Sequence, residues 1–487
     1  MSGVAVLLCS GTGLDADAVV GAPVAVIDHL CTRPAAAAAA LGELGASRVV
    51  LGLCNGRPNG DLIGALRRGG AVPFGIEAVT LSGRPRDEAA RLVEAASAKL
   101  AALAPEERGR PVLAANGMSR RALFSFAGVV MQVPVAAVAD AACVGIARCG
   151  LCFEACPVQA IGVAGALPSV DAAACNACGV CVPRCPHGAL RLAGSATAQV
   201  EAQLEKLLPG VEGIIFACRK ARADAPAGWA LVELPTLGLV TSGWILQTRA
   251  RGAQVRLAPC EGACCAGARD VDALAKRVLA ACEEPHTAMP ARLRLTEPLA
   301  TADAVRHLAA AGVTAVIEDD TSPLGVIALD TERCTLCGAC AAACPTSALL
   351  LDEAAQETVL RHEAAACVPC GRCVAACPED ALELRRGIDL AHLEAGTCDL
   401  ARAALETCDR CGADLPPGPM RRRLREVLPT LAGAPLELCT RCASRAARPT
   451  SDSNRGSGRL RDRAATVEYD AAAPPRHSEP AARERRR

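Results

Sequence analysis

The sequence predicts a multidomain protein of mixed α/β and α+β class, and three observations predict it. The 487 residues suffice for roughly three to four domains. Short β-rich runs alternate with alanine-rich helical runs over residues 1–115 and 200–330, a pattern typical of small α/β domains. The 29 cysteines gather mainly in tight clusters at 143–192, 330–385 and 398–445. We therefore expect two α/β domains, two cysteine-rich modules and a C-terminal cysteine region.

The composition excludes several classes of protein. Lys plus Arg and Asp plus Glu both number 52, so the formal net charge is zero, which argues against a broadly basic nucleic-acid-binding protein. Aromatic residues make up only 2% of the chain, too few for base-stacking surfaces. Hydrophobic residues make up 51%, which excludes disorder of the whole chain.

The cysteine spacing indicates metal binding in a reducing compartment. Repeated C-x-x-C runs in a long alanine-rich chain are typical of thiolates that hold metal, whereas secreted disulfide scaffolds are short. The N-terminus lacks the positive segment of a secretory signal, so a cytoplasmic location is expected. An uncharged stretch within residues 118–140 is either a buried internal segment or a membrane or export signal. Gln132 and Pro134 favour the buried segment, and no stable membrane span is expected.

The apolar pattern of residues 1–115 divides this stretch into strands and helices. Three single cysteines, Cys9, Cys31 and Cys54, lie near expected strand ends, either as small buried hydrophobic residues or as ligands of a cluster. No dinucleotide-binding fingerprint is complete, so no flavin is expected. Strands are expected at 4–8, 24–27, 49–53 and 72–76, and helices at 34–44 and 86–103.

Internal repetition is the strongest signal. A unit that ends in Cys-Pro and a short apolar run occurs four times. Three thiolates two residues apart can hold three corners of an iron–sulfur cubane on one loop, and the fourth, before the proline, reaches the cluster of the other repeat. The complete pattern C-x2-C-x2-C-x3-C-P occurs at Cys175, Cys178, Cys181 and Cys185, at Cys334, Cys337, Cys340 and Cys344, and at Cys367, Cys370, Cys373 and Cys377.

This arrangement resembles the bacterial two-cluster (2[4Fe-4S]) ferredoxins over residues 143–192 and 330–385. The resemblance implies ferredoxin-like modules in which each cluster takes three cysteines from one repeat and one from the other. In the second module, the two clusters take Cys334, Cys337, Cys340 and Cys377, and Cys367, Cys370, Cys373 and Cys344. In the first module, one cluster takes Cys175, Cys178, Cys181 and Cys156.

The remaining site of the first module departs from the pattern. It has Cys149, Cys152 and Cys185, but Ile146 stands where the first ligand is expected, and Cys143 lies three residues earlier. Either a wider loop lets Cys143 reach the iron, or the site holds a three-iron cluster or an unusual ligand. We therefore expect three complete [4Fe-4S] sites and a fourth that holds [4Fe-4S] or [3Fe-4S].

The N-terminal stretch also resembles a known family. Over about 100 residues it is similar to the N-terminal region of heterodisulfide reductase A-type iron–sulfur flavoproteins. The similarity is carried by the runs around Cys9, Cys31 and Cys54 and by the segment that ends at Glu77. In that family this region contributes cysteines to an extra cluster.

Residues 208–285 resemble the small iron–sulfur subunit that links hydrogenases to heterodisulfide reductase. That subunit holds a two-iron cluster, but here Leu237 stands where a thiolate is expected. A degenerate, structural domain and a metal site both remain open. The thiolates available to a metal are Cys218, Cys260, Cys264 and Cys265.

The C-terminal region contains two more cysteine pairs. Four thiolates suit tetrahedral Zn²⁺ or an iron–sulfur group alike, and the knuckle-like turn of the first pair favours structural zinc in a zinc-ribbon-like region. An arginine-rich helix at 419–428 is expected to present a solvated or protein-docking face. Residues 446–487 are predicted to be a disordered tail. The two pairs are Cys408 with Cys411 and Cys439 with Cys442.

These patterns predict a cytoplasmic electron-transfer protein without catalytic residues, a subunit of an oxidoreductase. Its expected partners are dehydrogenase, hydrogenase, reductase or flavoprotein subunits, and no nucleic acid is expected. Two alternatives remain open: a catalytic or flavin-associated subunit of a heterodisulfide-reductase-like enzyme, and a redox-sensing regulatory or assembly protein. The sequence leaves open the electron donor and acceptor, the direction of flow, the potentials and the oligomeric state.

Overall fold

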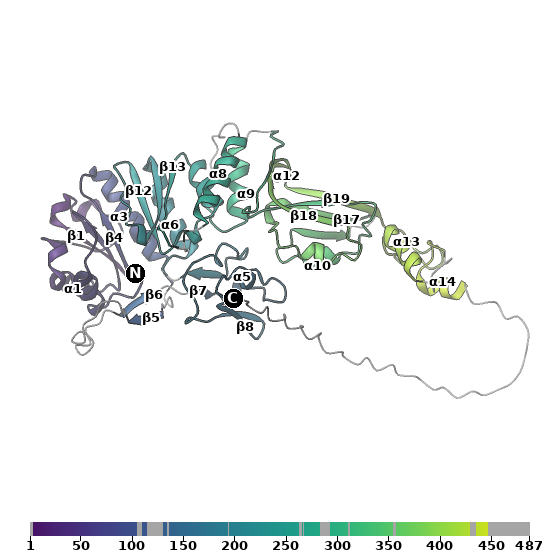
Figure 1. Cartoon of the computed structure of the whole chain (residues 1–487), viewed down its shortest axis with the longest axis horizontal. Coiled ribbons are helices and arrows are strands. Elements are labelled where there is room, and N and C mark those ends of the chain that lie inside the picture. The colour runs from purple at the N-terminus through teal and green to yellow at the C-terminus, as the bar shows by residue number, and fades with distance from the viewer. Residues whose placement is uncertain are drawn as a thin grey trace, which may run out of the picture.

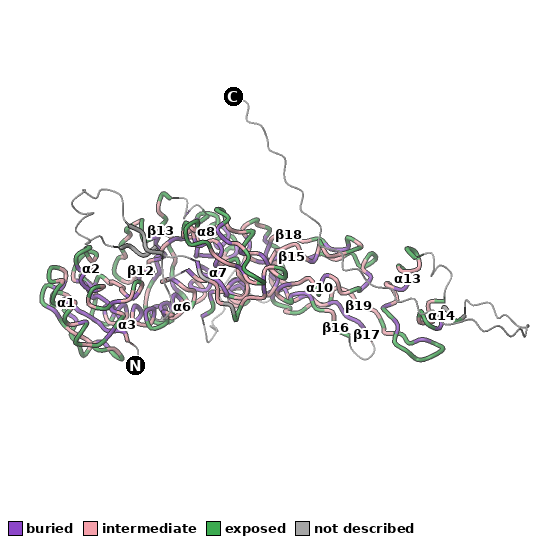
Figure 2. Tube along the Cα trace, turned by 90° about the horizontal axis from the view of Figure 1, so that it is seen from below, coloured by how far each residue is buried: buried purple, intermediate pink, exposed green. Residues whose placement is uncertain are grey.

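A computed structural model places the elements along an elongated molecule, with the first sheet at one end and the last helices at the other (Figure 1). Buried residues occur throughout the two α/β domains, and exposed residues are frequent around the last helices (Figure 2). The structure describes residues 3–104, 110–113, 130–133, 136–192, 194–262, 265, 267–282, 293–309, 312–353, 357–428 and 435–446.

The first sheet is parallel, with the strand order β2-β1-β3-β4. Alternate side chains of its two central strands enter two separate cores. Leu7 and Leu51 pack with α1 and α2 on one face, whereas Val6 and Val50 pack with α3 on the other. The elements are β1 (Val4–Cys9), β2 (Val24–Ile27), α1 (Pro34–Glu43), β3 (Arg48–Leu53), α2 (Gly60–Arg68), β4 (Ile76–Thr80) and α3 (Arg86–Ala101).

The second sheet is also parallel and has the order β12-β11-β13, so the first strand again lies in the middle. Its central strand is buried along its whole length, because helices and the first domain cover it. The elements are α6 (Thr197–Leu207), β11 (Gly213–Cys218), β12 (Trp229–Leu234), α7 (Ser242–Ala250), β13 (Gln254–Ala258), α8 (Ala268–Ala281) and α9 (Leu299–Leu308).

The two α/β domains pack against each other through α3 and α6. The fully buried Lys99 donates from Nζ to Glu77 Oε1 at 2.7 Å and to the Glu233 carbonyl at 3.4 Å. Arg84 adds bonds to the carbonyls of Trp229 and Ala225 at 2.8 and 2.6 Å. A buried charge is tolerated only when it is paired and hydrogen-bonded, so these contacts fix the docking of the domains.

The first cysteine-rich module contains small antiparallel sheets. The hairpin β8–β9 joins neighbouring segments, and the pair β10–β7 brings the two ends of the module together. The elements are β7 (Ala136–Val138), α5 (Leu151–Glu154), β8 (Ile161–Ala164), β9 (Leu167–Val170) and β10 (Leu190–Leu192). A further antiparallel pair is formed by β5 (Arg110–Leu113) and β6 (Val130–Val133).

The second module has two three-stranded sheets, β14-β18-β15 and β16-β17-β19. Strands on either side of the expected 330–385 range therefore belong to its sheets. The elements are β14 (Val316–Glu318), β15 (Gly325–Leu329), α10 (Ala339–Ala343), β16 (Leu349–Glu353), β17 (Glu357–Glu363), α11 (Arg372–Ala375), β18 (Leu382–Asp389), α12 (Leu390–Ala395) and β19 (Thr397–Ala404). Helices α13 (Gly418–Val427) and α14 (Thr440–Ala446) follow.

Two local predictions differ from the structure. The strand expected at 72–76 is wrong, because β4 begins only at Ile76. Pro73 has no N–H to donate, and the Gly75 N–H closes a turn on the Val72 carbonyl at 3.0 Å. Helix α2 was not predicted, although the side chain of Asn59 caps it by accepting from the Leu62 N–H at 2.8 Å.

None of the described helices is both long and apolar enough to span a bilayer. Of the uncharged stretch in 118–140, the structure describes β6 and residues 136–140. The remainder of this stretch and the predicted tail from 447 onward lie outside the described residues.

A buried carboxyl group joins α7 to α9. Glu297 Oε1 accepts from the Gly243 N–H at 3.1 Å and from the Thr301 hydroxyl at 3.0 Å, and Oε2 accepts from the Thr301 N–H at 3.2 Å. Burial raises the pKa of Glu297 from 4.5 to about 7, although these hydrogen bonds act in the opposite direction.

This pKa predicts a pH-dependent stability. Between pH 4.5 and 7 the unfolded chain loses the proton while the folded chain retains it, so stability falls as pH rises through this window. The variant Glu297→Gln should remove about 3 kcal/mol of this decline. The measurement is the free energy of unfolding of both proteins from pH 4 to 8. Parallel pH profiles for the two proteins would contradict the prediction.

Candidate metal centres

Each of the four repeats presents its cysteines from the same backbone shape. A glycine follows one cysteine in each ligand loop and has a positive φ: 68° at Gly150, 76° at Gly179, 75° at Gly338 and 73° at Gly371. Glycine enters this left-handed region without steric cost. In three repeats a short helix, α5, α10 or α11, begins at the next residue and carries the third cysteine. The C-x2-C-G-x-C sequence is therefore a turn that directs its thiols to one side.

The Cys-Pro end of each repeat also has a common shape. The third residue after this cysteine has a positive φ in all four repeats, and it is Gln159, Gly188, Ser347 or Asp380. In three repeats the sulfur accepts a backbone N–H from the alanine four residues later. The sulfurs of Cys156, Cys185 and Cys377 accept at 3.2, 3.2 and 3.3 Å. Such N–H···S bonds stabilise a thiolate and adjust the potential of a cluster that it holds.

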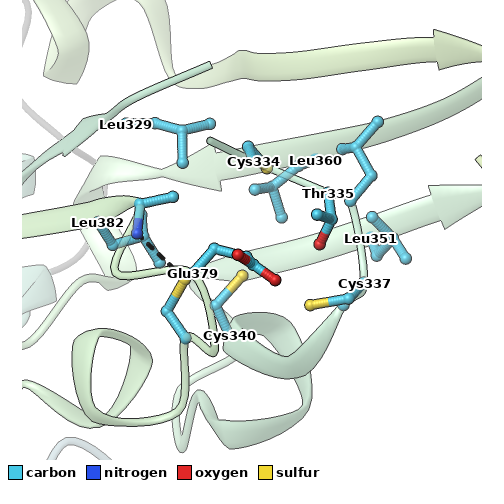
Figure 3. A pocket seen from close by; sticks show the side chains of 13 residues that line it. Leu329, Cys334, Thr335, Cys337, Cys340, Leu351, Leu360, Glu379 and Leu382 are labelled. Carbon is cyan, nitrogen blue, oxygen red and sulfur yellow. Dashed lines mark hydrogen bonds between the residues drawn. The ribbon is translucent and has the colours of Figure 1, made fainter. Parts of the chain in front are cut away.

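The second module gathers its cysteines in two crossed sets. One cavity is lined by Cys334, Cys337, Cys340 and Cys377, and another by Cys344, Cys367, Cys370 and Cys373. Figure 3 shows the first cavity, where the sulfurs of Cys337 and Cys340 point inward beneath Leu351, Leu360 and Leu382. The structure thus places together the two sets that the ferredoxin resemblance implies, each surrounded by apolar side chains.

Burial makes these thiols poor acids without a cation. Burial, with smaller contributions from neighbouring thiolates, raises the pKa of Cys340 and of Cys373 to about 11 and raises the pKa of Cys367 further. A thiol must lose its proton to ligate a metal, and a bound cation reverses this pKa shift. The residues present fit an iron–sulfur cubane, which takes four thiolates and tolerates an apolar shell.

The complete site of the first module has the same construction. Cys156, Cys175, Cys178 and Cys181 line one cavity together with Ile161 and Leu192. Burial raises the pKa of Cys181 to about 12, and the charges of Cys178 and Cys175 add to this effect. The crossed set expected for this site is therefore assembled.

The incomplete site brings Cys149, Cys152 and Cys185 together. Burial, with smaller contributions from the charges of Cys185, Cys149 and Cys143, raises the pKa of Cys152 to about 11. Cys143 is thus close enough to act on Cys152 electrostatically. Its sulfur accepts from the Gly145 N–H at 3.4 Å, in a turn where Gly145 has φ 87°. The extra residues between Cys143 and Cys149 form a loop that curves back toward the site.

The two C-terminal pairs form a four-thiol site. The sulfurs of Cys408, Cys411, Cys439 and Cys442 all lie within 4.8 Å of one another. The Cys439 N–H donates to Cys408 Sγ at 3.3 Å, and this bond is the largest cause that lowers the pKa of Cys408 to about 6. Four such sulfurs suit a tetrahedral ion.

The arginine-rich helix α13 packs against this site rather than facing solvent alone. The buried Arg421 pairs with Glu406 at 2.6 Å and donates to the Leu436 carbonyl. Arg423 pairs at 2.9 Å with Glu379, which lines the cavity of Cys334 in the second module. The expected protein-docking face of this helix therefore docks, in part, on the chain itself.

Two further groups of cysteines lie at the carboxyl ends of the parallel strands. Each group has three sulfurs within 4.8 Å of one another. Cys9 Sγ is 3.5 Å from Cys54 Sγ, and Cys260 Sγ is 3.6 Å from Cys265 Sγ. The groups are Cys9, Cys31 and Cys54, and Cys218, Cys260 and Cys265; Cys264 lies outside the described residues.

The sequence left these two groups undecided because their cysteines are far apart along the chain. The available signal was positional, since each group has one cysteine that ends a strand and another just after a neighbouring parallel strand. The carboxyl ends of parallel strands meet at one edge of a sheet, so such cysteines converge.

Comparison with known families identifies the two modules. Residues 313–382 match the 4Fe-4S dicluster domain, and residues 168–191 match the 4Fe-4S binding domain. The first match begins close to β14, in agreement with the pairing of that strand within the second module. A search of curated proteins finds no match. The chain therefore contains two ferredoxin-type iron–sulfur segments, at 168–191 and 313–382. Cys143, Cys149, Cys152 and Cys156 lie outside both matches.

Because Cys143 lies close enough to act on Cys152, we expect it to be the fourth ligand of the incomplete site. The variant Cys143→Ser should remove about one iron per chain and produce the EPR signal of an oxidised three-iron cluster. Ile146→Ala is the matched control and should leave iron content and EPR unchanged. Identical iron content and spectra in Cys143→Ser and the parent chain would show that Cys143 is not a ligand.

Proposed function

We propose that this chain is an electron-transfer protein that relays single electrons through several [4Fe-4S] clusters to or from a partner oxidoreductase. The observation that carries the proposal is the crossed assembly of cysteines in two ferredoxin-type modules of one chain. Four such groups in one chain serve one-electron transfer, because iron–sulfur clusters exchange electrons with little rearrangement of their ligands.

The surroundings of the sites support a relay. The cavity of Cys334 is lined by Leu329, Leu336 and Leu382, and four cysteines occupy its ligand positions. A cubane held at all four corners in such a shell has no iron open to a substrate. The protein's own contribution is to set each potential by burial, nearby charge and N–H···S bonds.

The α/β domains support the finer part of the proposal. Their similarity to heterodisulfide reductase and hydrogenase-linked iron–sulfur proteins suggests a place in such an assembly, in a reducing compartment. Under this proposal, the partner is a dehydrogenase, hydrogenase, reductase or flavoprotein subunit. The three-sulfur groups at the two sheet edges provide additional positions for iron–sulfur groups.

A second candidate function rests on those three-sulfur groups. Three thiolates leave one coordination position of a metal group to another ligand, which is the arrangement of catalytic metal sites. This observation favours a catalytic subunit of a heterodisulfide-reductase-like enzyme. Turnover of a disulfide substrate by the isolated chain, lost in Cys54→Ser but not in Cys143→Ser, would favour this candidate over a relay.

The relay predicts a defined metal content. Anaerobically purified chain should contain about 12 iron from the three complete sites, or about 15–16 when the fourth site is filled, with matching sulfide. Dithionite should bleach the visible absorption and produce EPR signals of reduced clusters. Iron near zero, with several zinc ions per chain, would overturn the electron-transfer function.

We also propose that the C-terminal site is a structural zinc site. Cys408, Cys411, Cys439 and Cys442 supply the four ligands of a tetrahedral ion. The buried Arg421 joins the two halves of the region, because it pairs with Glu406 and donates to the Leu436 carbonyl. Zinc there stabilises a segment that has only a small hydrophobic core of its own.

The zinc proposal predicts a separable metal. The variant Cys411→Ser should lose about one zinc per chain while iron stays constant. Cys398→Ser is the matched control, because Cys398 precedes Cys408 by ten residues, on β19, and belongs to none of the four-cysteine sets. Loss of iron rather than zinc in Cys411→Ser would instead make this an iron site.

A further inference from the structure

The two modules, distant in sequence, contact each other through one ligand loop from each. The loop of Cys149 and Cys152 continues into α5, and the loop of Cys370 and Cys373 contains α11. Arg372 donates from Nη2 to the backbone carbonyl of Cys149. The same atom lies 3.6 Å from a carboxylate oxygen of Glu154. The cysteine loops of two different modules are therefore one arginine side chain apart, in the region where Figure 1 places α5 beside the second module.

The contact leaves little room for any additional atom. A Cβ added at Gly150 would lie 3.0 Å from Arg372 Nη2 and 3.3 Å from the Ile146 carbonyl. The glycine that gives this ligand loop its left-handed turn thus also admits the arginine. Arg372 is unlike the residues at the same position of the other repeats, which are Leu151, Val180 and Ala339. The repeat pattern does not require a charge there, so the arginine belongs to the contact between the modules.

The electrostatics agree with this geometry. Burial is the largest cause that raises the pKa of both Cys149 and Cys370, and the charge of Arg372 lowers both values. The charge of Cys370 in turn raises the pKa of Cys149. The two sets of thiolates therefore lie within electrostatic reach of each other, with one guanidinium acting on both.

The other end of the first module contacts the second α/β domain. Thr236 Oγ1 donates to the Cys178 carbonyl at 3.1 Å, and a Cβ on Gly238 would approach that carbonyl to 2.2 Å. The thiol of Cys218 donates to the carbonyl of Pro235 in the same loop at 3.7 Å. The complete site of the first module is thus directed toward the three-sulfur group of the second sheet.

We propose that the two modules form one continuous electron path, which crosses between the sites of Cys370 and Cys149, and that Arg372 is the positioning residue of this crossing. The inference rests on the proposed relay function and deepens it by giving the order of the sites. The path runs from the site of Cys334 to that of Cys370, then to that of Cys149, and then to that of Cys178. The incomplete site, that of Cys149, therefore lies between the sites of Cys370 and Cys178 in the path.

The step at the crossing is a transfer of one electron. The group held by Cys344, Cys367, Cys370 and Cys373 gives up one electron and is oxidised, and the group held by Cys149, Cys152 and Cys185 takes it up and is reduced; the reverse direction is equally balanced. No bond forms or breaks and no proton moves. Dithionite supplies the electron in the experiment below.

The test compares single variants of the full chain, purified anaerobically and fully reduced. The readout is the microwave power that half-saturates the cluster EPR signals, because nearby paramagnets speed each other's relaxation. Arg372→Gln should lower this power at least about threefold, since it removes the charge-assisted contact that holds the modules together. Arg333→Gln is the matched control, because Arg333 precedes Cys334 in the same module and its guanidinium pairs with the exposed Asp380, at 3.7 Å.

The iron content of each variant distinguishes an altered contact between the modules from the loss of a cluster. Full iron in Arg372→Gln with unchanged half-saturation power, or an equal fall in Arg333→Gln, would overturn the crossing and leave the relay function intact. If Arg372→Gln itself loses iron, the variant Glu154→Arg provides the decisive test. Glu154 is largely exposed, and reversing its charge repels Arg372 while Arg372 and every ligand cysteine are retained. The same fall is expected there, and its absence would overturn the inference. A parent chain without iron would overturn the relay function together with this inference.

Discussion

Thiols that face one another in an apolar pocket can all ionise only around a cation, and the rest of this structure depends on that constraint. Burial, with smaller contributions from neighbouring thiolates, raises the pKa of Cys340 and Cys373 to about 11 and that of Cys181 to about 12. Without metal, these pockets hold neutral thiols with little to bind them together. With metal, the same burial shields the metal–sulfur bonds from water. The metal is therefore part of the core of each module.

The backbone of the modules adopts unfavourable φ values next to the ligand cysteines, at a cost in conformational energy. Ala177, Leu336, Ser347 and Asp380 adopt positive φ although they have side chains, and all lie within three residues of a ligand cysteine. Such residues cost about 1–3 kcal/mol each when the surroundings hold them there. Equivalent positions adopt positive φ in repeats that are far apart in the sequence, as at Ser347 and Asp380. The geometry of four thiolates around one metal group therefore explains them. The strained turns and the metal thus support each other.

Much of this organisation could be predicted from the sequence, for a physical reason. A ligand loop is a local structure, so the spacing of Cys334, Cys337 and Cys340 fixes which sulfurs share a site. Contacts between segments leave no such pattern. The three-sulfur group of Cys9 and Cys54 needs the parallel pairing of β1 with β3, and the contact of Arg372 with Cys149 needs the docking of two modules. The strand wrongly predicted at 72–76 also depends on a contact between segments. The apolar run from Val72 does not reveal which of its residues pair with β3.

The two α/β sheets place their cysteines by the same topology, and this bears on how electrons would enter or leave the modules. In each sheet the first strand lies in the middle and ends in a cysteine, Cys9 or Cys218. In each, a second cysteine follows the neighbouring strand, Cys54 or Cys260, and then a Gly two residues later. The second sheet lacks a cysteine after β12, where the loop from Pro235 to Gly238 instead packs on the carbonyl of Cys178. The position that would complete the three-strand set has thus become the contact with the first module. The second sheet thus uses the end of β12 to dock and the ends of β11 and β13 to hold sulfur, which joins its thiols to the module at that edge. In the first sheet, by contrast, a cysteine of the three-sulfur group ends β1 and one follows each of β2 and β3.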